Sequence, residues 1–110
     1  MEPELLPPGP EGRYIPADVS QIRILLSDSL QRYVSGAGEI GAAGTSIGRA
    51  IEDADRKSPG LLLAVCDETG AIRPHVNVFL NGDSVKAGSG LATPVSPNDE
   101  VHIIQAISGG

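Results

Sequence analysis

The chain has 110 residues, enough for one domain around a single core, and 40% of them are hydrophobic. Its formal net charge of -6 disfavours binding to nucleic acids and to anionic membrane surfaces, and suits a basic partner protein. Only three residues are aromatic, which leaves little for stacking on bases: Tyr14, Tyr33 and Phe79.

The beginning of the chain is rich in proline. Five prolines fall within the first sixteen residues, together with two glycines and few apolar side chains. Proline has no backbone N–H and disrupts both helices and strands, and so polar a stretch cannot bury enough surface to offset its ordering. We therefore predict a disordered tail over residues 1–17, a folded domain over 18–105 and a flexible tail over 106–110.

Regular elements are expected from residue 19 onward. Ile22, Ile24 and Leu26 alternate with other residues at the period of two that is typical of a strand with one buried face. Residues 27–37 predict a loop or a short helical turn. Residues 38–44 predict a weak strand that is diluted by glycine.

Residues 44–60 contain the clearest helix signal. Apolar residues recur there at helical spacing on one face: Ile47, Ala50, Ile51 and Ala54. Thr45 or Ser46 is expected to cap the first turn, and the sequence from Ser58 to Gly60 is expected to end the helix. Residues 61–72 contain a short apolar run that fits either a short helix or a strand.

The last third of the chain predicts three strands. Val76, Val78 and Leu80 share one face of a strand, Asn81-Gly82 is typical of a tight hairpin turn, and residues 84–86 form the returning strand. Residues 100–105 predict the final strand, with Val101 and Ile103 facing inward. The element order indicates an α+β fold in which one main helix lies across one face of a mixed sheet.

Strand parity predicts a second, open face of this sheet. If the residues named above face the helix, then Leu25, Phe79 and Ile104 must face the other way, together with Asn77 and His102. Apolar side chains on a solvent face often mark a partner surface. We expect this face to dock on another protein.

Signals of catalysis or metal binding are weak. No metalloprotease, CxxC, GxSxG or phosphate-loop motif is present, and the acidic residues 52–55 diverge around their helix, which favours a solvated helix face. Cys66 is the only cysteine, so no internal disulfide forms, and we expect a buried thiol. His75 and His102 are expected at ordinary surface positions. We predict no metal site and no enzymatic activity of the chain itself.

The expected cellular location follows from the same features. A single cysteine suits a reducing compartment, and the sequence contains neither a signal peptide pattern nor an apolar run long enough to cross a bilayer. We expect a soluble cytoplasmic protein.

The chain ends in two glycines, Gly109 and Gly110. Glycine has no Cβ, so such an end can pass through a channel too narrow for side chains and deliver its carboxylate to another protein's active site. A frayed end without function is the simpler alternative.

Several segments resemble a known family when they are taken together with this ending. They are LLSDSLQRYVSGAGEI, GTSIGRAI, SPGLL, RPHVNVFLNGDSV, GLATPV, NDEVHII and AISGG. Their order and spacing over residues 19–110 resemble the ubiquitin-like sulfur carriers of the MoaD/ThiS family. Within that family the likeness is greatest to carriers of thiocarboxylate-dependent cysteine synthesis and to small subunits of molybdopterin synthase.

The resemblance implies a β-grasp fold with the first and last strands adjacent in the middle of the sheet. It implies that the Gly110 carboxylate is adenylated by a ubiquitin-activating-type adenylyltransferase that uses ATP and magnesium, while the carrier itself binds no cofactor. A sulfurtransferase or persulfide donor then supplies sulfur, and a biosynthetic enzyme accepts it. Gly109 provides clearance, and Ile107 joins Leu25, Phe79, His102 and Ile104 in partner binding.

Three alternatives stay open from sequence. A ubiquitin-like modifier would transfer the same glycine to lysines, a synthase subunit would insert its tail into one stable partner, and an interaction domain would have an inert tail. The destination of the sulfur is also open among cysteine, molybdopterin, thiazole, thiolated tRNA and a sulfur-containing natural product. The proline-rich start and the residues Gln105 to Ser108 depart from the usual family pattern.

Overall fold

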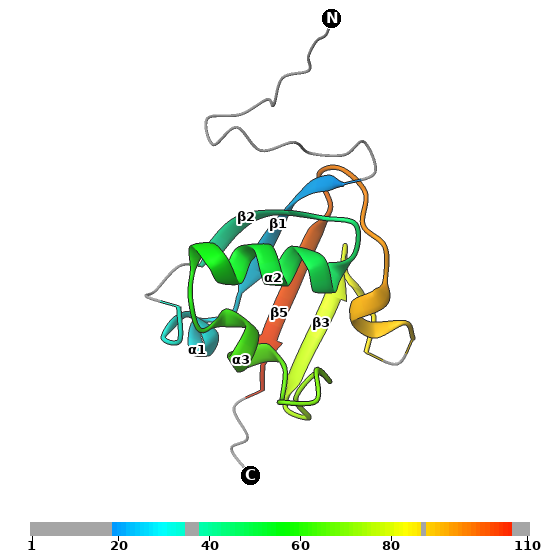
Figure 1. Ribbon diagram of the computed structural model, residues 1–110. Coiled ribbons are helices and arrows are strands. Elements are labelled where there is room, and N and C mark those ends of the chain that lie inside the picture. Colours follow the sequence, from blue (N-terminus) through cyan, green and yellow to red (C-terminus); the bar gives the residue numbers. More distant parts are fainter. Residues whose placement is uncertain (1–18, 35–37, 87, 107–110) are drawn as a thin grey trace, which may run out of the picture.

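The computed structural model describes residues 19–34, 38–86 and 88–106 of the chain. Its five strands form one sheet in the order β2-β1-β5-β3-β4 (Figure 1). The strands are β1 (Ser20–Leu26), β2 (Glu39–Gly44), β3 (Val76–Leu80), β4 (Asp83–Ser84) and β5 (Glu100–Gln105). The helices are α1 (Asp28–Gln31), α2 (Ile47–Lys57), α3 (Leu61–Val65) and the 3-10 turn η1 (Gly90–Ala92).

The first and last strands lie side by side at the centre of the sheet. β1 and β5 are parallel, with Ile24 opposite Val101 and Leu26 opposite Ile103. The pairs β1–β2, β3–β5 and β3–β4 are antiparallel. This arrangement, with one long helix on one face, confirms the predicted β-grasp fold.

The helix α2 crosses one face of the sheet and closes the core (Figure 1). Ser46 caps it, because its hydroxyl oxygen accepts a hydrogen bond from the Arg49 N–H at 3.3 Å. The four residues of the predicted helical stripe are all fully buried. They pack against the alternating strand residues, which are buried as predicted: Ile22, Ile24, Leu26, Val76, Val78, Val101 and Ile103.

The structure settles the ambiguous prediction for residues 61–72 and tests the predicted hairpin. The apolar run after Gly60 forms the short helix α3, and Cys66 then makes an isolated bridge to Ile72. The hairpin turn has Asn81 and Gly82 both at positive φ, as a tight two-residue turn requires. The returning strand was expected at residues 84–86, and these bounds are wrong, because β4 covers only Asp83–Ser84.

The prediction of a solvated acidic helix face is wrong for Asp53. This residue is only 4% exposed, and its carboxylate accepts a hydrogen bond from the N–H of Ala43 on β2 at 2.9 Å. It also pairs with Arg56 at 2.7 Å and Lys57 at 3.4 Å. Burial acts to raise the pKa of Asp53, but the hydrogen bond from Ala43 and the two cations outweigh it and hold that pKa below its ordinary value.

Side chains bind backbone groups on both sides of the sheet. At the β2 edge, Asp53 binds the N–H of Ala43 and Lys57 donates to the carbonyl of Gly41 at 2.6 Å. On the other side, β4 pairs only with the end of β3, and the ammonium group of Lys86 donates to the carbonyls of Val76 at the start of β3 at 2.8 Å and of two residues in the preceding loop. An unpaired sheet edge invites another strand, so these contacts disfavour edge-to-edge association.

Candidate functional site: the root of the C-terminal tail

The end of β5 is held on both sides. The N–H of Gln105 donates to the Ser27 hydroxyl at 3.1 Å, and the Ser29 hydroxyl donates to the Gln105 carbonyl at 3.3 Å. On the other side, the N–H of Ala106 donates to the carbonyl of His75 at 2.8 Å. The last described residues are therefore fixed to neighbouring segments at the end of a central strand.

The predicted reactive end itself lies outside the described residues. The structure does not describe Ile107, Gly109 or Gly110. Of the two expected tails, residues 1–17 and 106–110, it describes only Ala106. What the structure describes is the platform from which these last residues start.

The open face of the sheet has the predicted composition. Leu25 on β1 pairs with His102 on β5, and His102 pairs with Phe79 on β3. All three side chains are partly exposed. One residue further towards the tail root on this face, Ile104 pairs with Asn77 and is 41% exposed. The structure thus brings together all the predicted docking residues that it describes.

Charged side chains border this apolar row. Arg23 forms an ion pair with Glu100 on β5 and a second one with Glu39 on β2 at 3.6 Å. The Nε2 atom of His102 lies 3.4 Å from the Glu100 carboxylate. The open face is therefore an apolar strip with a charged margin at the end far from the tail.

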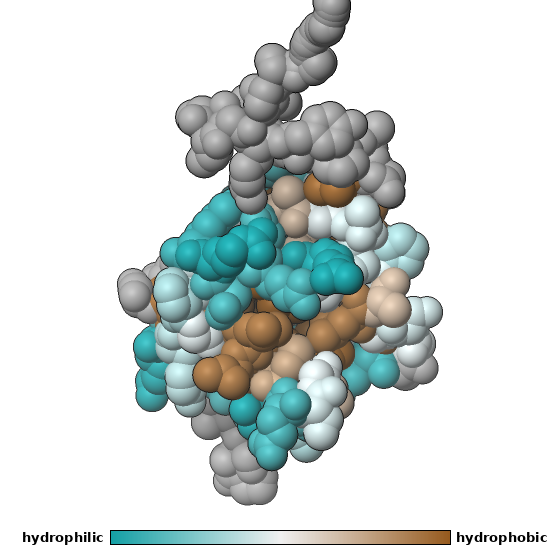
Figure 2. All heavy atoms as spheres, viewed as in Figure 1, coloured by the Kyte–Doolittle hydropathy of each residue, from teal (hydrophilic) through white to brown (hydrophobic). Residues whose placement is uncertain are grey.

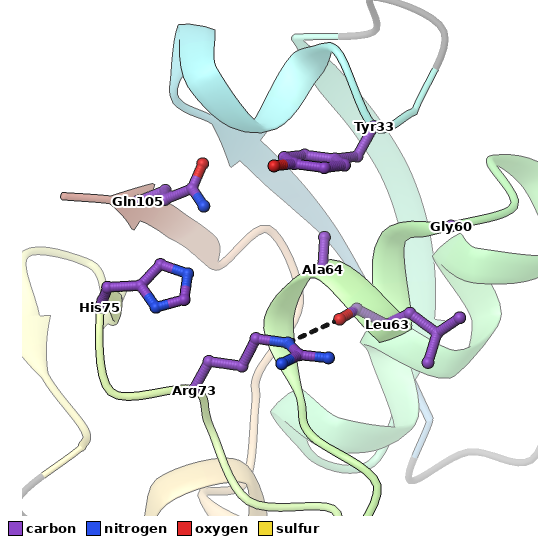
Figure 3. Close-up of a pocket in the computed structure, with 7 residues that line it drawn as sticks. All are labelled: Tyr33, Gly60, Leu63, Ala64, Arg73, His75 and Gln105. Carbon is purple, nitrogen blue, oxygen red and sulfur yellow. Dashed lines mark hydrogen bonds between the residues drawn. The ribbon is translucent and has the colours of Figure 1, made fainter. Parts of the chain in front are cut away.

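A pocket of about 410 Å³ lies on the helix side of the tail root (Figure 3). Its walls come from four segments that are distant in sequence: Tyr33 after α1, Leu63 and Ala64 on α3, Arg73 and His75 before β3, and Gln105 on β5. Tyr33 is 51% exposed and Leu63 is 70% exposed. Sequence reasoning missed this pocket.

Gly60 allows the walls of this pocket to approach each other. Its φ of +107° is a conformation that suits glycine, and a Cβ added there would lie 2.6 Å from the carbonyl oxygen of Tyr33. Because glycine has no Cβ, the segment after α1 can lie against the start of α3. The sequence predicted this glycine only as part of a helix stop, and its positive φ and its close approach to Tyr33 are seen only in the structure.

The remaining candidate residues have structural roles or ordinary positions. Cys66 is buried as predicted, and burial raises the pKa of its thiol, with a further contribution from the charge of Asp67. His75 is exposed and His102 is partly exposed. Within residues 19–34, 38–86 and 88–106, no group of His, Cys, Asp or Glu side chains is arranged to hold a metal ion. No helix among the described residues is long and apolar enough to span a membrane.

Comparison with known proteins agrees with this architecture. A model of the ThiS family matches residues 25–110, which extend from the end of β1 through α2 and β5 to the diglycine end. The chain belongs to the ThiS family. Its resemblance to the MoaD/ThiS carriers is thereby confirmed.

Three similar proteins match most of the length of this chain. Sulfur carrier protein CysO of Mycobacterium tuberculosis H37Rv is 26% identical over 91 residues, which cover 81% of this chain and 98% of that protein. CysO in the Amycolatopsis orientalis BexX/CysO complex structure matches with a TM-score of 0.73 at 22% identity, covering 81% and 99%. Small archaeal modifier protein 1 of Methanosarcina acetivorans matches with a TM-score of 0.71 at 20% identity, covering 84% and 98%.

Proposed function

We propose that this ThiS-family chain is a sulfur carrier whose Gly110 carboxylate is adenylated by a partner enzyme and converted to a thiocarboxylate. The observation that carries the proposal is the family match over residues 25–110, which extends through the two terminal glycines. The likeness to CysO over 98% of that carrier's length supports it. In this role the chain is a protein substrate and not a catalyst.

The chemistry needs two steps because a carboxylate is a poor acyl electrophile. First, a carboxylate oxygen attacks the α-phosphorus of ATP, and pyrophosphate leaves to give the acyl-adenylate. Then hydrosulfide attacks the acyl carbon, AMP leaves, and one proton is released as the thiocarboxylate forms. ATP and magnesium belong to the partner's active site, and the carrier contributes the acyl group.

The fixed root of the tail suits this role. Gln105 is held by Ser27 and Ser29, and Ala106 is held by the His75 carbonyl. A short arm that starts from a rigid point searches a small volume, which keeps the effective concentration of its end high in a docked complex. The partner therefore needs to recognise the body of the carrier in order to place the carboxylate.

We assign this recognition to the open face of the sheet. Leu25, Phe79 and Ile104 form a partly exposed apolar strip beside the tail root, with His102 among them. Burial of such a strip against the adenylyltransferase would contribute about 25 cal/mol per Å² of apolar surface. Ile107 would extend the contact into the tail.

The mass of the intact chain tests the proposal. Incubation with ATP, magnesium, sulfide and a candidate adenylyltransferase is expected to add about 16 Da, the difference between sulfur and oxygen. A chain that lacks Gly109 and Gly110 is the matched control and should gain nothing. The carrier role would be contradicted if the mass of the full chain stayed unchanged with every ubiquitin-activating-type adenylyltransferase of its source organism.

Phe79→Asp tests the docking face. We expect the KM for the carrier in the adenylation reaction to rise about tenfold or more, because a charge replaces a desolvated apolar contact. Ser89→Asp adds the same charge at an exposed position and should leave KM within about twofold. Equal KM values for the two variants would remove the open face from the interface.

A modifier function is the second candidate, since the fold also matches small archaeal modifier protein 1. The chain has two lysines, and both ammonium groups bind backbone carbonyls, Lys57 at Gly41 and Lys86 at Val76. Such lysines are poor acceptors, so the chain is not expected to link to itself. Isopeptide adducts on other proteins, found by mass spectrometry after activation, would favour the modifier.

A further inference from the structure

Polar side chains from three segments line the pocket at the tail root: Tyr33, Arg73, His75 and Gln105. Arg73 donates from Nε to the Leu63 carbonyl at 2.8 Å, and this contact leaves its two terminal nitrogen atoms available (Figure 3). Figure 3 also shows the Tyr33 hydroxyl directed towards the side of the pocket where His75 and Gln105 lie. The pocket therefore presents hydrogen-bond donors to whatever enters it.

The residues that line the pocket include the cation Arg73 and no carboxylate, although the whole chain has a net charge of -6. Asp55 lies beside the pocket, where its carboxylate accepts a hydrogen bond from the N–H of Gly60 at 3.2 Å. Four described cations form ion pairs with carboxylates: Arg23, Arg49, Arg56 and Lys57. Arg73 forms no such pair with a described carboxylate, although its charge lowers the pKa of nearby Asp67 after the larger effect of Thr69 hydrogen bonds. Lys86 does not line this pocket, and its ammonium group binds the carbonyls of Arg73, Pro74 and Val76.

The pocket also has an apolar wall on its outer side. Tyr33 and Leu63 are two of the three large hydrophobic residues that are exposed in the described chain. Figure 2, which views the helix-covered side, shows apolar surface over α3 below the polar surface of α2. An occupant with an apolar side chain next to an anionic one would match both parts of the site.

Position connects the pocket to the tail. Gln105 lines it, and the next residue, Ala106, is bound to His75 on its rim. The open-face strip and this pocket lie on opposite faces of the sheet, and the tail root lies between them. A protein that takes up the tail must come close to the pocket.

We propose that this pocket binds an acidic side chain, with an apolar neighbour, of the protein that receives the C-terminal tail. The proposal rests on the carrier function proposed above. The carboxylate meets the Arg73 guanidinium, and the apolar neighbour packs on Tyr33 and Leu63. The pocket thus recognises the partner's negative charge close to the site where the partner takes up the tail. The open face supplies apolar contact area.

A pair of substitutions at Leu63 separates charge from apolar contact. Leu63→Asp and Leu63→Lys remove the same exposed side chain and introduce opposite charges, and neither disturbs the core. With an acidic occupant, Leu63→Asp should raise the KM for adenylation about tenfold, and Leu63→Lys by no more than about threefold, with kcat unchanged in both. Arg73→Gln should raise KM and reduce its dependence on salt. Equal losses for the two Leu63 variants would overturn the acidic occupant.

A peptide titration gives a readout that does not depend on adenylation. The probe is acetyl-Phe-Asp-Leu-Glu-amide, and the matched control has Asn and Gln in place of the acids. Amide chemical shifts of the full chain should move at Leu63, Ala64 and His75 with the acidic peptide, at least fivefold more than with the control. Shifts that are equal for both peptides, or confined to the open face, would refute the site.

The two experiments also distinguish the possible failures. Absence of the 16 Da gain with intact peptide binding would reject the carrier function and keep the pocket as an acidic-peptide site. A normal mass gain without any charge effect at Leu63 would reject the pocket alone. If deletion of residues 107–110 changes the shifts of Tyr33 and Leu63 without peptide, the occupant is the chain's own tail and the proposal is wrong.

Discussion

The two faces of the central sheet use the same strands for different purposes. On the helix side, Ile24, Val101 and Ile103 are fully buried under α2. On the open side, the alternate residues Leu25, His102 and Ile104 remain accessible. Neighbours in sequence therefore belong to two chemically separate surfaces.

This difference shows how a small domain can use one set of residues for stability and another set for binding a partner. The buried face supplies the free energy of folding, since apolar burial contributes most of it. The open face can change its side chains at low cost to the fold. Substitutions at matched positions on the two faces test this separation. The largest difference in stability is expected between Ile103 on the buried face and its neighbour Ile104 on the open face.

Ile103→Ala should destabilise the chain by about 2–5 kcal/mol, because it leaves a cavity in the closed core. Ile104→Ala removes the same atoms from the open face, where the side chain is 41% exposed, and should cost at most about 0.5 kcal/mol. Urea unfolding measures both. Similar costs for the two variants would show that the open face also contributes to the core.

Gly44→Ala and Gly41→Ala make the same comparison on β2. A Cβ at Gly44 would lie 2.5 Å from the backbone nitrogen of Ala50 on α2, whereas a Cβ at Gly41 meets no atom within 4 Å. Gly44→Ala should therefore cost about 1–3 kcal/mol. Gly41→Ala should be neutral or stabilise by about 0.5 kcal/mol, because alanine loses less backbone entropy. Thermal unfolding of the pair gives the result.

Asp53→Asn tests the buried carboxylate of the helix side through pH. The folded pKa of Asp53 is lowered, so its contribution is fully present above the unfolded pKa of about 3.9 and is lost as pH falls through the folded pKa. The variant should cost about 1–2 kcal/mol at pH 7, and its difference from the native chain should shrink below about pH 4. Glu68→Gln removes one exposed charge and serves as control. A difference independent of pH would assign the effect to packing.

Arg23→Gln is expected to have the smallest effect. The ion pairs of Arg23 with Glu39 and Glu100 lie on the open face, and about half of the arginine side chain is exposed. Such pairs contribute at most about 0.5 kcal/mol, and salt screens them. Unfolding at low and high ionic strength should show a difference only at low salt. A loss as large as that of Asp53→Asn would contradict the comparison of the faces.

Much of the fold was predictable because its signals are local. The alternation of Ile22, Ile24 and Leu26 and the Asn81-Gly82 turn each depend on residues close in sequence. The burial of Asp53 was not predictable in this way, because its reason is the N–H of Ala43 on a neighbouring strand. A short apolar run such as α3 has no diagnostic period, so its type depended on the packing around it.

The candidate site divides in the same manner. Parity predicted the open face, since it follows from strand alternation and the register of the sheet. The pocket needed the three-dimensional fold, because Tyr33, Leu63, Arg73 and Gln105 come from separate segments. Only their assembly shows that unpaired donors and exposed apolar groups lie around the start of the tail.

The parallel pairing of β1 and β5 also has a mechanical consequence. A force between the start of β1 at Ser20 and the end of β5 at Gln105 acts along both strands in opposite directions. The hydrogen bonds between them are then loaded in shear and must break together, not one after another. An unfolding enzyme that pulls on the C-terminal end would therefore have to apply a high force. We expect the domain to resist mechanical unfolding from that end.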